Sequence, residues 1–234
     1  MQDLVSFKNV VVVSGNFPIL TGIDFEAGPG EVVSVKGRNG AGKTSFLRAV
    51  AGLLRITRGS ASVLGVDLVS NPADARHRVG LLGHDSFLYE DLTARENVSF
   101  VLRATRSDTA RVESSLAAVG LTGRLSDLKV AVMSAGQRKK VALAALLARE
   151  PELWLLDEPH ASLDSWTRDV LDSALIAAVA NGSTVLVVSH EPHHGALVPT
   201  RTVEIGGGKV INDVRASGSA DAALTTKLGT GNVA

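Results

Sequence analysis

Gly37-Arg38-Asn39-Gly40-Ala41-Gly42-Lys43-Thr44 is the stretch of sequence that decides the fold. The residues before it, 32–35, form a short apolar run of the kind that makes a buried strand. The residues after it, 46–54, carry large apolar side chains at helical spacing. A glycine-rich turn between a strand and the N-terminus of a helix is where a phosphate-binding loop is built.

Each residue type in this loop has its own chemical role in binding a nucleotide. Glycines allow consecutive backbone N–H groups to point at an anion, and the first turn of the following helix adds partial positive charge. Lys43 can place its ammonium against the β- and γ-phosphates, and the Thr44 hydroxyl is a ligand for Mg²⁺. The expected ATP-binding residues are Gly37, Arg38, Asn39, Gly40, Ala41, Gly42, Lys43, Thr44 and Ser45.

Composition favours an ordinary enzyme. The chain has 234 residues, 45% of them hydrophobic, with 24 acidic and 24 basic side chains. Balanced charge gives no support to a nucleic-acid partner. The absence of cysteine excludes disulfides and thiolate metal sites and fits a reducing compartment. The N-terminus lacks a targeting pattern and no apolar run reaches about 18 residues, so the chain itself is not expected to enter a bilayer.

The order of patterns along the chain predicts an α/β core with two additions. Short apolar or alternating runs at 4–7, 10–13, 22–25 and 31–35 predict an N-terminal antiparallel β lobe. Further strands are expected at 59–65 and 79–83. The pattern is helical from 93 to 149, with Ser134 as the N-cap of its last helix, and predicts a helical sub-lobe at about 86–150 inserted in the core.

Residues 202–211 predict a terminal hairpin. We expect one domain over residues 1–212, followed by a flexible tail at 213–234, where large apolar residues are few.

Two acids follow the apolar residues 153–156, which suit a central parallel strand buried on both faces. Acids at the carboxyl end of such a strand lie where α/β sheets bind ligands. Asp157 is expected to hold Mg²⁺ through its water shell, and Glu158 to take a proton from the attacking water. A second apolar strand, 184–189, ends in His190, which is a candidate for contact with the γ-phosphate.

The chain resembles the ATP-binding cassette (ABC) ATPases. The resemblance is carried by Met133-Ser134-Ala135-Gly136-Gln137, which is similar to their signature, by residues 157–164, which are similar to their Walker B element and D-loop, and by His190. It implies a P-loop NTPase of the ABC type with a mixed, mainly parallel sheet, and Glu158, His190 and Lys43 as catalytic residues.

The same resemblance implies a head-to-tail dimer or pseudo-dimer of ATPase subunits. ATP on the Lys43 loop of one copy would be enclosed by Ser134, Ala135, Gly136 and Gln137 of the other, with Asp164 in the D-loop.

Within the family, residues 134–144, 153–159 and 92–97 look most like the ATP-binding subunit of the haem exporter of cytochrome c biogenesis. This implies a peripheral protein at the cytoplasmic face of the cell membrane. Residues around 85–106 would then meet separately encoded transmembrane subunits. Two alternatives are an ABC-type ATPase of another export system and a soluble single-cassette ATPase such as one serving iron–sulfur cluster assembly. A scaffold that binds nucleotide without hydrolysis is a third.

Two positions depart from the family pattern. The aromatic residue that stacks on adenine would fall near Ser14, with Phe17 as the closest ring. The glutamine that precedes the helical lobe aligns with Asp85, or with His84 in a competing alignment. Aspartate can bind Mg²⁺ through oxygen, but it adds negative charge near the triphosphate.

His190-Glu191-Pro192-His193-His194 satisfies the zinc-peptidase pattern, in which two histidines on consecutive helical turns share a metal. Pro192 lies inside the pattern and a strand leads straight into it, so the required helix is not expected.

Overall fold

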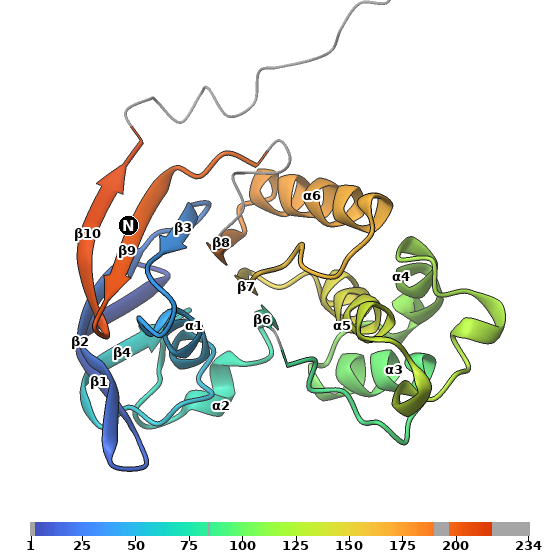
Figure 1. Ribbon diagram of the computed structural model, residues 1–234, viewed down its shortest axis with the longest axis horizontal. Helices are drawn as coiled ribbons and strands as arrows, with labels where there is room; N and C mark the ends of the chain where they lie inside the picture. The colour runs from blue at the N-terminus through green and yellow to red at the C-terminus, as the bar shows by residue number, and fades with distance from the viewer. Residues whose placement is uncertain (1–2, 84, 190–196, 217–234) are drawn as a thin grey trace, which may run out of the picture.

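The computed structural model describes residues 3–83, 85–189 and 197–216. Two sheets lie beside a group of helices (Figure 1). In chain order the elements are β1 (Val5–Ser14), β2 (Phe17–Ala27), β3 (Val32–Lys36), α1 (Lys43–Val50), β4 (Arg58–Val63), β5 (Val66–Asp67), α2 (Pro72–Ala75), β6 (Val79–Leu82), α3 (Ala94–Ala104), α4 (Val112–Ala118), α5 (Ala135–Arg149), β7 (Leu153–Asp157), α6 (Ser165–Ala180), β8 (Thr184–Val188), β9 (Arg201–Gly206) and β10 (Lys209–Arg215).

The central sheet has six strands in the order β10-β9-β3-β8-β7-β6. Strands β9, β3, β8, β7 and β6 all run parallel to one another, and the edge strand β10 runs antiparallel to β9. The carboxyl ends of the parallel strands therefore meet at one edge. This edge receives the loop that follows β3 and the two acids at the end of β7.

Strand β7 supplies both hydrophobic cores because its side chains alternate between the two faces of the sheet. Leu153 and Leu155 join the core that lies between the two sheets, whereas Trp154 and Leu156 join the core formed with the helices. All five residues of β7 are buried. A strand buried on both faces reads as an uninterrupted apolar run, which is the pattern that predicted it.

The second sheet is antiparallel, in the order β2-β1-β4-β5. Helix α1 packs between the two sheets, and its Phe46 ring meets Phe7 and Phe25 edge-on at centroid distances of 6.0 and 5.1 Å. Aromatic pairs prefer this edge-to-face geometry. The packing fixes the direction of α1, and therefore of the phosphate-binding loop at its N-terminus.

Strand β1 differs from the sequence expectation, which placed two short runs at 4–7 and 10–13. They form one strand with a break in register between Phe7 and Val10. Asn9 lies there at φ 49°, and its backbone N–H donates to Asp24 Oδ1 at 2.8 Å. A bulge of this kind interrupts the alternation of side chains between the two faces of one long strand.

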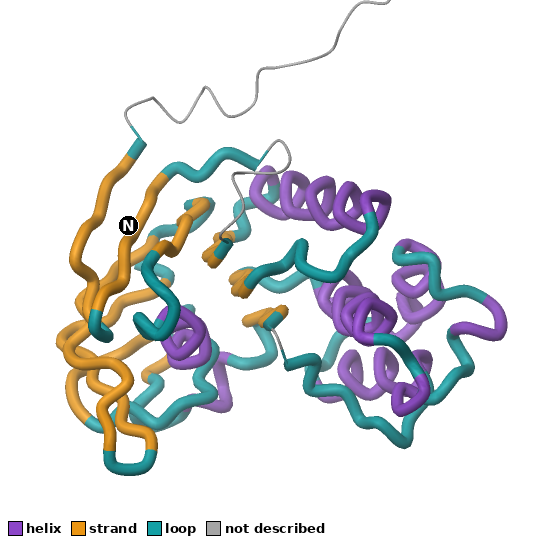
Figure 2. The backbone as a smooth tube through the Cα atoms, in the orientation of Figure 1, coloured by secondary structure: helices purple, strands orange, loops and turns teal. Residues whose placement is uncertain are grey.

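Helices α3, α4 and α5 lie together at the right of Figure 1 and occupy the chain between β6 and β7. Figure 2 shows the strands gathered away from them. Two of these helices begin with reciprocal capping boxes, formed by Thr93 with Glu96 and by Ser134 with Gln137. Each box satisfies N–H groups that a helix start leaves without intrahelical partners, so the Ser134 cap is confirmed.

The C-terminal hairpin is longer than expected, because β10 runs to Arg215 and not to residue 211. The rest of the expected tail, residues 217–234, lies outside the described residues. Among the helices of the described chain, none is long and apolar enough to cross a membrane.

Arg201, at the start of β9, ties this strand to β10 and β2. Its side chain is only 8% exposed. The guanidinium donates to both carboxylate oxygens of Asp213 at 2.7 and 2.5 Å and to Glu26 O at 2.6 Å, and it lies 5.3 Å from the Phe25 ring centroid. Bidentate pairing of a buried guanidinium is one of the stronger polar contacts in proteins.

The hydrogen bonds donated by Arg201 lower the pKa of Asp213 below its ordinary 3.8. The pair therefore stabilises the fold fully at pH values above the ordinary pKa of aspartate. This stabilisation is lost as the pH falls through the lowered pKa of Asp213. We predict that Asp213→Asn decreases the free energy of unfolding by about 1–2 kcal/mol at neutral pH, a value reduced for the partial exposure of the carboxylate. Urea titrations should show that the difference in free energy of unfolding between the wild type and the variant disappears in strong acid. A difference that persists there would contradict this account.

Candidate functional site

The loop between β3 and α1 approaches β9 so closely that glycine is required at its first position. Gly37 adopts φ 145°, and a Cβ there would lie 2.2 Å from Ile205 O. Gly42 forms the N-cap of α1 at φ 106°. Residues 37–42 therefore form a turn that leads directly into the first turn of α1, where a helix N-terminus can bind an anion.

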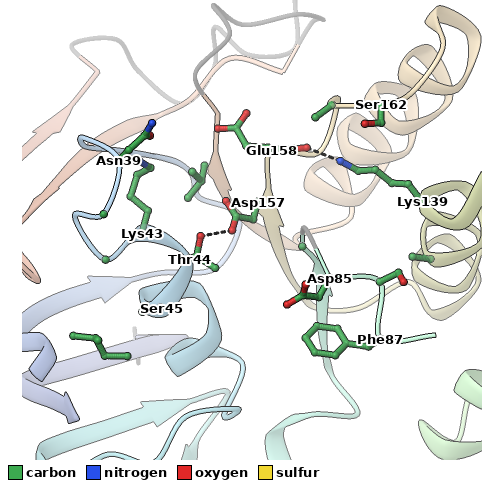
Figure 3. Close-up of a pocket in the computed structure, with 18 of the residues that line it drawn as sticks. Asn39, Lys43, Thr44, Ser45, Asp85, Phe87, Lys139, Asp157, Glu158 and Ser162 are labelled. Atoms are coloured by element: carbon green, nitrogen blue, oxygen red, sulfur yellow. Dashed lines mark hydrogen bonds between the residues drawn. The ribbon is translucent and has the colours of Figure 1, made fainter. Parts of the chain in front are cut away.

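Lys43 is buried, and its ammonium folds back into the loop. Nζ donates to Gly37 O at 2.7 Å and to Arg38 O at 3.1 Å. These carbonyls hold the cation where a phosphate group bound by the loop amides would meet it. Lys43 lines a cleft in the surface of the protein (Figure 3), and Asn39 and Gly40 also border it.

Thr44 and Asp157 come together from opposite parts of the sequence. The Thr44 hydroxyl donates to Asp157 Oδ2 at 2.5 Å across 113 residues of chain. A hydroxyl and a buried carboxylate beside a phosphate loop form an oxygen donor set, which suits Mg²⁺ with its preference for oxygen ligands. Among the described residues, no cluster of three or more histidine, cysteine or acidic side chains could hold a metal ion.

Glu158 follows Asp157 in a left-handed backbone conformation, at φ 47°. Its N–H donates to Val188 O at 2.9 Å. Both acids border the same cleft as Lys43, which has a volume of about 1300 Å³. Glu158 therefore lines the same cleft as the residues of the phosphate loop.

Asp85 also borders the cleft, but its carboxylate is paired with another group. Oδ2 accepts a hydrogen bond from Arg48 Nη2 at 2.6 Å, and Arg48 belongs to α1. The pair offsets the extra negative charge that aspartate brings to this position. His84, the competing candidate, and His190 lie outside the described residues.

Pro18 and Ile19 border the cleft at the start of β2. Ser14 ends β1, and Phe17, at the first position of β2, is exposed. Hydrocarbon side chains therefore border this end of the described cleft.

The residues Ser134, Ala135, Gly136 and Gln137 form the first turn of α5. Ser134 Oγ accepts from Gln137 N at 3.2 Å, and Ser134 N donates to the Gln137 side chain at 2.9 Å. Gly136 lies against the segment after β7, because a Cβ there would be 3.0 Å from Ser162 O.

Asp164 caps α6 and joins it to α5. Its carboxylate accepts from Thr167 N and Oγ1, and it pairs with Lys140 Nζ at 2.5 Å. The Lys140 hydrogen bond and those of Thr167 lower the pKa of Asp164 well below its usual range. The carboxylate is therefore charged at all physiological pH values and can serve as a fixed link between the two helices.

The turn between β9 and β10 contacts the phosphate loop; the sequence predicted this hairpin but not its contact with the loop. Gly208 N donates to Ala41 O at 3.0 Å, while Gly208 O accepts from Thr21 N at 2.8 Å. A Cβ on Gly208 would lie 2.8 Å from Ile19 O, whereas one on Gly207 would meet nothing within 4 Å. Three consecutive glycines at a hairpin turn were the available signal.

Comparison with known proteins is consistent with this site. Residues 20–161 match the family profile described as ABC transporter. The chain is 35% identical to the "Cytochrome c biogenesis ATP-binding export protein CcmA" of Vibrio vulnificus (strain YJ016), over 87% of this chain and 100% of that protein. It is 37% identical to the protein of that name from Bradyrhizobium diazoefficiens, over 86% and 98% of the two chains.

Among solved structures, the fold is similar to the "Dimeric structure of a post-hydrolysis state of the ATP-binding cassette MJ0796 bound to ADP and Pi". The TM-score is 0.81 at 26% sequence identity, covering 92% of this chain and 100% of that one. A "Structure of ATP binding subunit of ABC transporter" gives a TM-score of 0.82 at 25% identity, over 91% and 90%.

The Gly208 contacts predict a difference between two neighbouring substitutions. Gly207→Ala and Gly208→Ala both place alanine at positive φ, 56° and 76°, so they share the backbone strain. Only Gly208→Ala also forces the turn away from Ile19 and Ala41. We expect Gly208→Ala to weaken Mg·ATP binding roughly tenfold relative to Gly207→Ala, because the phosphate loop loses its support. Equal affinities by calorimetry would show that the turn does not position the loop.

Proposed function

The chain belongs to the ABC transporter family, and from that premise we propose that it is the ATP-hydrolysing subunit of a haem exporter that serves cytochrome c biogenesis. The family assignment makes the chain an ATP-binding protein that hydrolyses ATP. The observation that carries the proposal is the similarity to the cytochrome c biogenesis export proteins over nearly their whole length.

The chemistry would begin with Lys43. On nucleotide binding its ammonium would turn from the Gly37 and Arg38 carbonyls onto the β- and γ-phosphates, while the loop amides enclose the β-phosphate. When bound, Mg²⁺ would neutralise charge on the phosphate oxygens, and Thr44 and Asp157 are the residues that would hold it.

Glu158 would act next, as the base. A carboxylate oxygen of Glu158 would accept a proton from the water that attacks the γ-phosphorus in line with the leaving oxygen of ADP. His190, which follows β8 in the sequence, would contact the γ-phosphate. Asp85 remains a candidate for the metal shell, with Arg48 as the partner that would have to release it.

A second copy of the subunit would complete the site. The capping box satisfies the N–H groups of Ser134 and Gln137, whereas those of Ala135 and Gly136 have no intrahelical partner and can meet a γ-phosphate held by a neighbouring copy. Ser134 is exposed at this turn and available for such a contact. The similar cassette structure is described as dimeric, which supports the same arrangement here.

The face that would meet the membrane subunits lies beside the cleft. Phe87, Tyr89 and Phe100 are 62%, 54% and 46% exposed, and the Tyr89 and Phe100 rings meet edge-on at 4.9 Å. Buried Asn97 holds the loop in shape, since Oδ1 accepts from Tyr89 N at 2.8 Å and Nδ2 donates to Tyr89 O and Leu92 O. Exposed aromatic groups on this loop and on α3 suit a protein partner. We infer a peripheral position at the cytoplasmic face of the membrane.

The assigned role of Glu158 predicts the phenotype of Glu158→Gln. Glutamine keeps the shape of the side chain but cannot accept the proton, so turnover should fall roughly 10²- to 10⁴-fold. Mg·ATP affinity should stay close to that of the wild type. Steady-state ATPase assays and equilibrium binding measure the two quantities. Normal turnover by the variant would remove Glu158 from its role.

The proposed partner face predicts which proteins are recovered with the chain from native membranes. Wild-type protein should co-purify with multi-spanning subunits and with cytochrome c maturation proteins. Phe87→Ser combined with Tyr89→Ser should lose them while keeping ATPase activity, and Val69→Ser, at an exposed residue elsewhere, should retain them. Recovery with soluble cluster-assembly proteins alone would overturn the transporter assignment.

A further inference from the structure

Lys139 links the signature helix to the end of strand β7. Its Nζ donates to the backbone oxygen of Glu158 at 2.6 Å (Figure 3). Burial lowers the pKa of Lys139, and the negative charges of Glu158 and Asp157 oppose that shift. A half-buried lysine whose ammonium donates to a specific carbonyl is held in one position, unlike a lysine on a fully solvated face.

The backbone at Glu158 is a place where such a contact matters. A non-glycine residue at φ 47° occupies a region that costs about 1–2 kcal/mol and persists only where neighbours hold it. Three hydrogen bonds do so: Glu158 N donates to Val188 O, and Glu158 O accepts from Ala161 N and from Lys139 Nζ. Only the Lys139 bond comes from outside the central sheet and its own loop.

Helix α5 carries Lys139 and Ser134 on one rigid element. Lys139 is five positions after the N-cap Ser134, a rise of about 7.5 Å. The same helix contacts the segment after Glu158 twice more, through Gly136 against Ser162 O and through the Lys140–Asp164 pair. A displacement of the first turn of α5 is therefore passed directly to the backbone that orients Glu158.

We propose that Lys139 is a positioning residue that sets the direction of the Glu158 carboxylate according to the position of α5. The proposal rests on the function given above and deepens it: a γ-phosphate of a neighbouring copy, bound at the Ser134 turn, would adjust through Lys139 the hydrolysis at this chain's own nucleotide. The link joins the two sites of a dimer through one side chain of each subunit.

The test is the steady-state ATPase activity of the full chain with Lys139→Met, which keeps the length of the side chain and removes its charge and donors. We expect kcat to fall about 10- to 100-fold, the cost of a misplaced catalytic group, with KM for ATP within about threefold of the wild type. Lys139→Gln, a second variant that retains polarity but is too short, should show the same loss. Lys139→Arg keeps a cationic donor and should recover most of the lost kcat.

Lys129→Met is the matched control, because Lys129 is an exposed lysine of the helical region that borders no part of the cleft. It should leave kcat, KM and Tm unchanged. The proposal is overturned if Lys139→Met keeps kcat within twofold of the wild type, if Lys139→Arg is as slow as Lys139→Met, or if the loss lies in KM or Tm alone. A wild-type chain that binds ATP without hydrolysing it would overturn the proposed function as well, so the two failures are distinguishable.

Discussion

The hydrogen bond between the Thr44 hydroxyl and the Asp157 carboxylate is the interaction on which the site depends. It joins the helix after β3 to the end of β7, two strands that are separated in the sheet by β8. Parallel strands bring their carboxyl ends to one edge, and the packing of Phe46 between the sheets aims α1 at that edge. Without this alignment the phosphate loop and the two acids would not meet at one site.

Local sequence sufficed for the parts of the site that are built from consecutive residues. The glycines, Lys43 and Thr44 follow one another between a strand and a helix, and the Ser134 cap is set by Gln137 three residues later. Contacts between distant segments were not predictable in this way. Lys139 and Gly208 matter because folding brings them to Glu158 and Ala41, and no local period encodes those approaches. The bulge at Asn9 was hidden for a similar reason, since it depends on pairing with β2.

Charge is balanced locally as well as over the whole chain. The cleft gathers Asp157, Glu158 and Asp85. Arg48 on α1 pairs with Asp85, Lys139 on α5 interacts electrostatically with Glu158 and Asp157, and Lys43 lines the same cleft. A triphosphate adds negative charge, which Lys43, Lys139 and Arg48 would help to neutralise. Helix α5 would respond to this added charge, because it contacts the backbone at Glu158 and begins with the turn that would face a neighbouring copy.

The most direct test of the account is whether the Lys43 loop of one copy meets the Ser134 turn of another. The chain contains no cysteine, so Asn39→Cys and Ser134→Cys can be introduced separately, in a Glu158→Gln background, and the two proteins mixed with a short bifunctional thiol reagent. The account predicts a cross-linked pair that forms with Mg·ATP and not with ADP. Cross-linking that is absent with Mg·ATP, or that is independent of nucleotide, would contradict it.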